Sequence, residues 1–316
     1  MARYVERAEN LARVLDVNET FSRDTQGGQN WRSVLQLYDD VERFLAHHDE
    51  ASAAAVTYFY VLDPENPGSI LSAIRMAREN ARTLRPLIST EMWIQLNIFY
   101  NRLRALTADD LREPRLVRLC GFIKESCQAH TGITEGTFYR DAGWSFYQMG
   151  RNLERADQTT RLLDVKYHLL LPSPAAVGSP VDISQWNAVL RSASGYHAYR
   201  RVRPSGMTAA SVAGFLLFHA NFPRSVHACV RALGDALAEL RAHFALDAGT
   251  QAAAELGALL RSLESERIDA VVARGLHEYI DGIQIRLMAI TAALGGEFFG
   301  VDSGDAASDS ESAGQA

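Results

Sequence analysis

Apolar residues recur along nearly the whole chain with the 3.6-residue spacing of an α-helix. No stretch keeps the strict alternation of a half-buried strand beside its neighbours. The pattern therefore predicts an all-α protein that folds as a multi-helix bundle. We expect helices near residues 2–22, 30–48, 51–62, 69–88, 91–106, 108–129, 134–171, 183–200, 208–220, 223–244, 248–264 and 267–298.

Local start signals support three of these helices. Ser69 follows Asn66-Pro67, and Thr107 and Asp182 each have a polar partner three residues later. A serine, threonine or aspartate at such a position can accept a hydrogen bond from the first free backbone N–H groups of a helix.

Two stretches interrupt the helical pattern. Residues 172–180 read PSPAAVGSP, which is typical of a linker, so the domain could divide near 172–181. Residues 301–316 are acidic and carry too little apolar surface to fold. We therefore predict one helical domain over residues 1–300, followed by a disordered acidic tail.

One charged motif occurs twice, 148 positions apart, as RYVERAENLARVLDV from Arg3 and as RNLERADQTTRLLDV from Arg151. Both copies place an adjacent Glu-Arg pair, a second acid, an arginine and an aspartate in the same order. These residues are Glu6, Arg7, Glu9, Arg13 and Asp16 in the first copy, and Glu154, Arg155, Asp157, Arg161 and Asp164 in the second. Both copies read as helix, so we predict an internal duplication of a charged motif helix about a pseudo-twofold axis.

On each motif helix the charged stripe borders the apolar stripe, at the edge of the expected core. A carboxylate or guanidinium buried there must find a partner, because an unpaired buried charge is strongly destabilising. Ordinary pairs four residues apart on a wet surface would explain a single copy. For two copies with the same charge order, a shared structural ion network and a functional site both remain open.

The two copies differ in what precedes them. The segment DAGWSFYQ comes before Met149, whereas Met149 aligns with Met1. We therefore expect the first motif helix to leave apolar residues such as Tyr4 and Leu11 partly uncovered.

A basic stripe lies on the helix expected to begin at Ser69. It contains Arg78, Arg82 and Arg85, with Arg75 one turn earlier. Such a ladder could hold phosphate or carboxylate groups of a ligand. We favour internal pairing with the motif acids, in which the two acidic stripes and the basic stripe meet in one interior cluster.

Tyr199, Arg200 and Arg201 form a third polar group just before Pro204, where a helix should end. An aromatic and basic cluster of this kind could stack against and hold an anionic ligand. The same residues could instead satisfy the free carbonyls of a helix C-terminus. Both interpretations remain open.

The 316 residues are 47% apolar and 22% charged, which is enough for a substantial core. Arginine supplies 30 of the 32 basic residues, and it suits bidentate pairing with carboxylate or phosphate. The net charge is −6, of which the tail contributes four acids, so the body is close to neutral. A near-neutral body argues against general nucleic-acid binding.

The sequence lacks the motifs that would indicate several kinds of binding site or a membrane location. Cys120, Cys127 and Cys229 are odd in number and lack C-x-x-C spacing, so we expect buried thiols. The histidines form no zincin or di-iron set and no known phosphate-binding loop occurs, so we assign no metal-binding or cofactor-binding residues, and the sequence leaves the cofactor unknown. No apolar run spans a bilayer and no signal peptide is evident, so we predict a cytoplasmic protein without a membrane segment.

Several longer stretches carry a resemblance to a known family. They are NPGSI at 66–70, ARENAR at 77–82, EMW at 91–93, RDAGWSFYQMGRNLERAD at 140–157, GYHAYRR at 195–201, FPRSV at 222–226 and HEYIDGIQ at 277–284. On these residues the chain resembles the bacterial alpha-E domain proteins. Glu79 and Glu91, within two of the stretches, join the candidate site residues.

The resemblance implies association with circularly permuted ATP-grasp ligases and transglutaminase-like proteins, and a role in forming or modifying peptide or amide bonds. We favour an accessory, non-catalytic helical subunit that serves such a ligase. The alternative is an enzyme that uses Glu6, Glu154 and their acidic neighbours as general acid/base groups or metal ligands on a small or peptide substrate.

Overall fold

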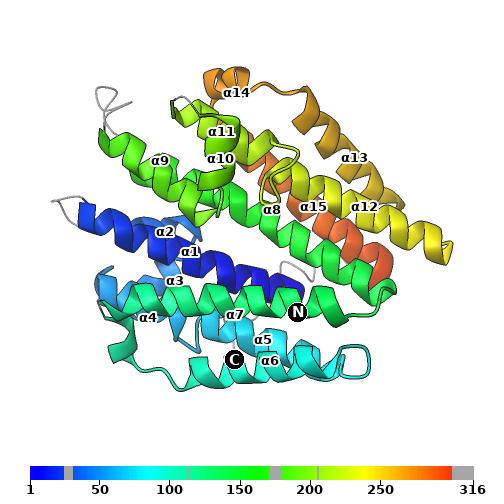
Figure 1. Cartoon of the computed structure of the whole chain (residues 1–316), viewed down its shortest axis with the longest axis horizontal. Helices are drawn as coiled ribbons and strands as arrows, with labels where there is room; N and C mark the ends of the chain where they lie inside the picture. The colour runs from blue at the N-terminus through cyan, green and yellow to red at the C-terminus, as the bar shows by residue number, and fades with distance from the viewer. Residues whose placement is uncertain (25–30, 113, 171–179, 205, 301–316) are drawn as a thin grey trace.

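The computed structural model describes residues 1–24, 31–112, 114–170, 180–204 and 206–300. Every regular element within these ranges is a helix, which confirms the predicted all-α class (Figure 1). The first half contains α1 (Ala2–Asp24), α2 (Arg32–Leu37), α3 (Val41–Leu45), α4 (Ala53–Val61), α5 (Ile70–Thr83), α6 (Thr90–Arg104), the 3-10 turn η1 (Ala108–Leu111) and α7 (Arg115–Thr137). The second contains α8 (Ala142–Leu170), α9 (Pro180–Ser192), α10 (Tyr196–Val202), α11 (Ala209–Phe218), α12 (Val226–Phe244), α13 (Thr250–Ser265), α14 (Ile268–Arg274) and α15 (Leu276–Phe299).

The two motif helices, α1 and α8, lie at the centre of the molecule and pack against each other. Helix α1 also packs against α5 and α7, with α6 against both of these. Helix α8 packs against α12 and α15, with α13 against both of these. Figure 1 shows α1 and α8 running in the same direction, with one group of helices on each side of the pair. The motif helices therefore join two helical groups.

The core is continuous across this central pair. Its largest fully buried side chains include Trp31, Phe44 and Tyr60 in the first half and Tyr199 in the second. Burying a large apolar side chain stabilises the fold by about 1.5–3 kcal/mol. Cys120, Cys127 and Cys229 are free thiols inside this core, as predicted.

Side-chain caps set the start of several long helices. The hydroxyl of Ser69 accepts the N–H of Ser72 at 3.1 Å, and that of Ser225 accepts the N–H of Ala228 at 3.1 Å. A cap of this type stabilises a helix by about 1 kcal/mol. The start signal at Ser69 is thus confirmed.

Three expected long helices are each broken in two, because one residue at each break has a positive φ. The helix expected over 30–48 breaks at Asp39 (φ 56°), and that over 183–200 breaks at Ser194 (φ 56°). The helix expected over 267–298 breaks at Gly275 (φ 116°). Left-handed or otherwise positive φ values end a right-handed helix.

Two other boundaries are corrected. The helix expected over 108–129 is a 3-10 turn followed by α7, because Pro114 cannot continue the hydrogen-bonding pattern of a preceding helix. The helix expected over 134–171 is the end of α7 and the whole of α8, separated at 138–141.

The core face of α1 also differs from expectation: Leu11 is only 2% exposed, although Tyr4 is partly exposed as predicted.

Two predictions concern stretches that the structure does not describe. The predicted linker, near which the domain could divide, lies on such a stretch over residues 172–179, and its last residue, Pro180, begins α9. The tail at 301–316 also lies outside the described residues. Among the described residues, no helix combines the length and apolar composition needed to cross a bilayer.

Candidate functional site

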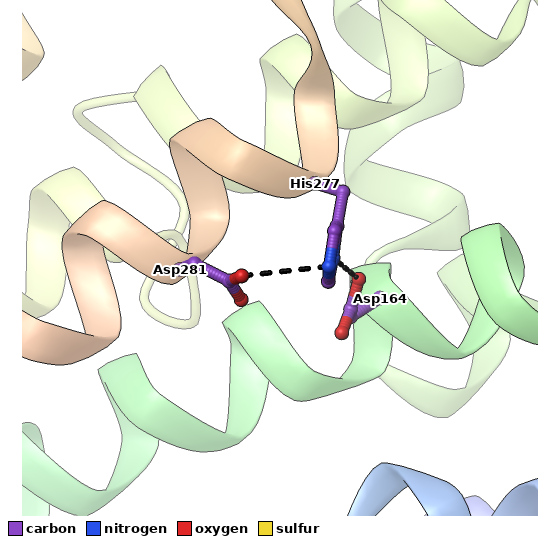
Figure 2. A group of neighbouring side chains, drawn as sticks. All are labelled: Asp164, His277 and Asp281. Carbon is purple, nitrogen blue, oxygen red and sulfur yellow. Dashed lines mark hydrogen bonds and ion pairs between the residues drawn. The ribbon is translucent and has the colours of Figure 1, made fainter.

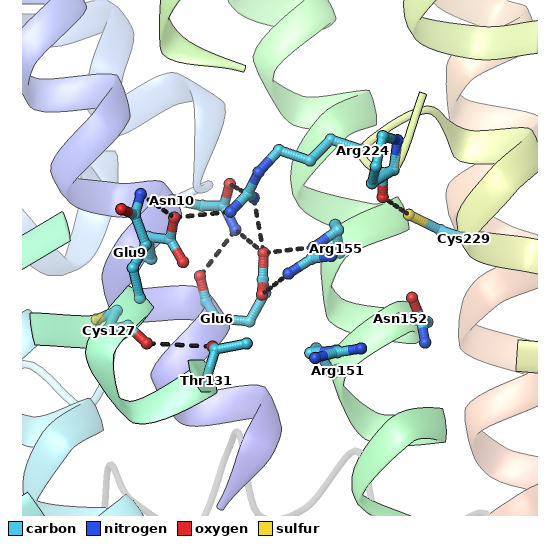
Figure 3. A network of polar contacts seen from close by, with 12 residues as sticks. Glu6, Glu9, Asn10, Cys127, Thr131, Arg151, Asn152, Arg155, Arg224 and Cys229 are labelled. Carbon is cyan, nitrogen blue, oxygen red and sulfur yellow. Dashed lines mark hydrogen bonds and ion pairs between the residues drawn. The ribbon is translucent and has the colours of Figure 1, made fainter. Parts of the chain in front are cut away.

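The two Glu-Arg pairs of the motif helices exchange partners. Glu6 of α1 accepts hydrogen bonds from Nε and Nη2 of Arg155 on α8, at 2.9 and 2.7 Å. Conversely, Arg7 of α1 donates to both carboxylate oxygens of Glu154 on α8, at 2.8 and 3.1 Å. Figure 3 shows the Glu6 side of this exchange. The two acidic stripes thus meet, as predicted, and each glutamate pairs with the arginine of the other helix.

The register of this contact follows the sequence repeat. Arg3 also donates to Glu154, at 3.0 Å, and its side chain lies against Gly150. Positions on α1 therefore contact positions about 148 residues later, and the helices run side by side in the register of the two motif copies. The duplication itself remains an interpretation of the sequence.

An interior network extends the exchange beyond the motif helices. Arg224, in the loop before α12, donates to Glu6 at 2.8 Å and to Glu9 at 2.6 Å. Arg13 donates to Glu9 at 2.5 Å and to the carbonyl of Ser192 at 2.7 Å. Nothing in the charge pattern singles out Arg224, although FPRSV, one of the stretches that carry the resemblance, contains it.

Contacts with arginine keep Glu6 and Glu154 ionised. Burial alone would raise the pKa of Glu6, but Arg155 and Arg224 outweigh it and lower the pKa to about 2. Burial would likewise raise the pKa of Glu154, and Arg7 and Arg3 lower it. Glu6 and Glu154 are therefore ionised at neutral pH.

A cavity of about 670 Å³ opens beside Glu154, between α1, the α2-α3 turn, the start of α5 and α8. Three ion pairs lie in its wall: Arg7 with Glu154, Arg43 with Asp40 at 2.9 Å, and Arg161 with Asp157 at 2.8 Å. Arg75 and Asp39 also line it, and neither side chain forms a hydrogen bond or ion pair within the part of the chain that the structure describes.

Polar side chains fix the wall formed by α2 and α8. The hydroxyl of Tyr38 donates to Gln158 at 3.3 Å, and the amide of Gln158 donates to Glu154 at 3.2 Å. Tyr60 donates to Asp40 at 3.1 Å, and burial raises the pKa of both groups. The cavity is therefore bounded by positioned charges.

The predicted position of the basic stripe on α5 is wrong. Arg78 donates to Asn97 at 2.7 Å and to Glu79 at 2.8 Å, and Arg82 donates to Glu79 at 2.8 Å. Arg85 lies over the ring of Trp93, 5.8 Å from its centroid. The stripe faces α6, so these arginines do not join the motif acids.

The remaining candidates on α6 and α10 do not gather at one place. Glu91 is exposed and lines a groove between α6 and α7. Tyr199 is fully buried and shares a 2.6 Å hydrogen bond with Ser211. Arg200 and Arg201 are exposed. Tyr199 therefore belongs to the core, apart from the arginines that follow it.

The last acid of each motif pairs with a cation from another helix. Lys124 of α7 donates to Asp16 at 2.6 Å, and His277 of α15 lies 2.8 Å from Asp164. The other ring nitrogen of His277 lies 3.4 Å from Asp281, as Figure 2 shows. Burial would lower the pKa of His277, but Asp164, Asp281 and Glu278 raise it.

The group of Asp164, His277 and Asp281 has the composition of a metal site, with its ligand atoms within 4.8 Å of one another. The histidine spacing did not predict this group, although His277 and Asp281 stand four residues apart on one helix. Both ring nitrogens face a carboxylate, which suits a protonated imidazolium, and Lys124 makes the matching pair with Asp16. We therefore interpret the group as a protonated His277 paired with Asp164 and Asp281, and not as a metal site.

A family model named Alpha-E, described as a predicted alpha-helical domain with a conserved ER motif, matches residues 1–299. The chain is 25% identical to an uncharacterized protein of Mycobacterium bovis, over 93% of this chain and 35% of that protein. Uncharacterized proteins from two strains of Mycobacterium tuberculosis match over the same shares at 25% and 24% identity. The chain thus spans about a third of the length of these curated relatives. No solved structure matches it significantly.

The two glutamates should differ in their effect on stability. Glu6→Gln leaves Arg155 and Arg224, each 12% exposed, short of negative charge, and should lower the free energy of unfolding by about 3–5 kcal/mol. Glu154→Gln should cost about 1–3 kcal/mol, because Arg7 and Arg3 are 34% and 43% exposed and can turn to water. Urea unfolding measures both, with Glu91→Gln, an exposed carboxylate, as a control that should leave stability unchanged. Equal losses of stability in Glu6→Gln and Glu154→Gln would contradict the expectation that Glu6 contributes more to the stability of the fold.

The stabilisation by Glu6 should also depend on pH. Its pKa is about 2 in the folded protein, against an ordinary value of 4.5. A lowered pKa contributes stability that is complete above the unfolded value and is lost as the pH falls toward the folded value. The stability difference between wild type and Glu6→Gln should therefore be constant from about pH 7 to 5 and shrink between about pH 4.5 and 2. Urea unfolding at each pH would contradict this if the difference did not change.

Proposed function

The chain belongs to the alpha-E family, and we propose that it is a non-catalytic helical subunit that presents a charged small molecule or peptide to a partner enzyme. The partner is an ATP-grasp-type ligase or a transglutaminase-like protein, and the process is the formation or modification of peptide or amide bonds. The observation that carries this proposal is the cavity beside Glu154, lined by Arg75 and Asp39, whose side chains have no partner among the described residues.

The cavity has the size and charge distribution of a ligand site. Its volume, about 670 Å³, is within the range of small-molecule sites. The three ion pairs in the wall balance one another, so Arg75 and Asp39 supply one positive and one negative charge for a ligand. Amino acids and short peptides carry charges of both signs, which supports a ligand of this class.

The protonation of the motif acids favours the accessory role over the alternative enzymatic one. A general acid or base works best when its pKa lies near the working pH. Glu6, with a pKa of about 2, and Glu154, with a lowered pKa, are poorly suited to exchange protons near neutral pH. The arginines around both carboxylates also oppose the approach of a metal cation.

The partner is proposed from the family resemblance and from the size of the relatives. About two thirds of each mycobacterial relative lies outside the matched segment, so the domain occurs there within a larger protein. An accessory role beside other domains is consistent with that arrangement. Nucleic acid is not an expected partner because the net charge is −6, and the cytoplasmic location remains a prediction.

The test reconstitutes the full chain with an ATP-grasp ligase from its own host and measures ATP turnover. The wild-type chain should raise the turnover of the ligase and hydrolyse no ATP by itself. Arg75→Glu, which reverses an exposed charge at the cavity, should remove at least about 80% of this stimulation, since charge reversal opposes an anionic ligand group. Arg104→Glu, an exposed arginine on α6, is the matched control.

ATP hydrolysis by the isolated chain would contradict the accessory role. Equal stimulation by wild type and Arg75→Glu would show that the cavity does not serve the partner. The same loss in Arg75→Glu and Arg104→Glu would assign the effect to general surface charge.

A further inference from the structure

The surroundings of the two motif helices repeat contact by contact. Arg13 of α1 donates to the carbonyl of Ser192 at the end of α9, and Arg161 of α8 donates to the carbonyl of Leu37 at the end of α2. Two residues after each carbonyl, Ser194 and Asp39 both have a φ of 56°. The arginines thus reach the same kind of helix end.

The helix ends close with the same backbone hydrogen bonds. The N–H of Asp40 bonds the carbonyl of Leu35 at 2.9 Å, and the N–H of Gly195 bonds the carbonyl of Leu190 at 2.7 Å. Both bonds span five residues, which is the C-cap pattern that a left-handed residue permits. Helices α2 and α9 therefore occupy matching positions beside α8 and α1.

The loops before α5 and α12 also match. Ser69 and Ser225 cap these helices, and each hydroxyl donates to the carbonyl six residues earlier, at 2.7 Å in both loops. Two residues before each serine stands a proline, Pro67 or Pro223. The residue between proline and serine is Gly68 in the first loop and Arg224 in the second.

The difference between Gly68 and Arg224 separates an open site from a filled one. Arg224 places its guanidinium between Glu6 and Glu9, as Figure 3 shows. The corresponding motif acids of α8 are Glu154 and Asp157, and both line the cavity together with Gly68. The cavity thus lies where the first loop has no side chain equivalent to Arg224.

We propose that this cavity binds a guanidinium group of its ligand between Glu154 and Asp157, in the position that Arg224 takes between Glu6 and Glu9. The proposal rests on the proposed function of the cavity and names its ligand class. A planar guanidinium can donate to two carboxylates at once, which a single ammonium does less well. Arg224 demonstrates this geometry within the same molecule.

Glu154 and Asp157, the motif acids that line the cavity, can accept further hydrogen bonds from a ligand guanidinium. Asp157 pairs with Arg161, four residues away on its own helix, whereas Glu9 pairs with both Arg13 and Arg224. Glu154 has Arg3 as its second partner, and that side chain is 43% exposed. A ligand cation would therefore complete the set of contacts at Asp157.

The neighbouring positions agree with an open site. Thr159 of α8 holds the Arg224 loop through a 2.8 Å hydrogen bond to the carbonyl of Arg224. The corresponding residue of α1 is Leu11, which lines the cavity near Gly68 and makes no such bond. Arg75 supplies a positive charge for a carboxylate, so the ligand combines a guanidinium with a carboxylate, as in arginine or a peptide ending in arginine.

The test measures binding to the full chain, with any affinity tag removed, by isothermal titration calorimetry. The probes are L-arginine, the neutral isostere L-citrulline, and agmatine, which lacks the carboxylate. L-arginine should bind at one site. L-citrulline and agmatine should each bind at least about tenfold more weakly, because each loses charge-assisted hydrogen bonds.

Two variants locate the binding to the cavity. Gly68→Arg should abolish binding of L-arginine, because its own side chain fills the position as Arg224 does. Its melting temperature should be at or above that of wild type, since the new guanidinium pairs with Glu154 and Asp157. Asp157→Asn should weaken binding at least about tenfold. Gly136→Arg, at an exposed glycine of α7 with free space around it, is the matched control and should bind like wild type.

Equal binding of L-arginine and L-citrulline would overturn the guanidinium assignment, and so would unchanged binding in Gly68→Arg. No detectable binding of L-arginine would overturn it as well. In each case the proposed function would stand if Arg75→Glu still reduced stimulation of the ligase. If L-arginine binds as expected and Arg75→Glu leaves the ligase unaffected, the ligand class holds and the presenting role fails.

Discussion

The exchange of glutamate and arginine between α1 and α8 is the interaction on which the rest of the structure depends. Glu6 and Glu154 are 3% and 1% exposed, and a buried carboxylate without a partner would cost several kcal/mol. Each pairs with an arginine of the other helix, and these contacts form only when the two helices run side by side in one register. Since each helix carries its own group of packed helices, the exchange also fixes how the two halves of the molecule meet.

The exchange is symmetric in its pairs but not in its surroundings. Around Glu6 the guanidinium of Arg224 lies between Glu6 and Glu9, and Arg13 pairs with Glu9. Around Glu154 the same helix face opens on a cavity whose wall holds charges of both signs. One half of the molecule therefore contains a filled version of the site that the other half leaves open.

The sequence predicted what depends on local periodicity. The helical class and the position of the charged stripe at the edge of the core follow from spacing along one helix. The meeting of the two motif helices was predicted from the repeated charge order of the two copies. The breaks at Asp39 and Ser194 were missed because neither residue is glycine, the usual signal for a positive φ. The interior network needed Arg224, which lies more than 200 residues from Glu6, and no periodic pattern reports a contact at that separation.

The wrong prediction that Arg78 and Arg82 meet the motif acids has a related cause. Helical angles place a charged stripe relative to the apolar stripe of its own helix, but they do not say which neighbouring helix it faces. On α5 the stripe faces α6, where Asn97 accepts a hydrogen bond from Arg78, while Glu79 of α5 itself pairs with Arg78 and Arg82. The cavity was missed for the same reason, because its wall combines turns and helices from five parts of the chain.

A double-mutant cycle on Glu6 and Arg155 tests the central claim most directly. The free energies of unfolding of Glu6→Gln, Arg155→Gln and the double variant should give a coupling energy of about 1–3 kcal/mol, because the two side chains bond directly across the helix pair. The same cycle on Glu154 and Arg155, which adjoin in sequence but pair with other residues, should give less than about 0.5 kcal/mol. A coupling between Glu6 and Arg155 no larger than that of the adjacent pair would contradict the exchange.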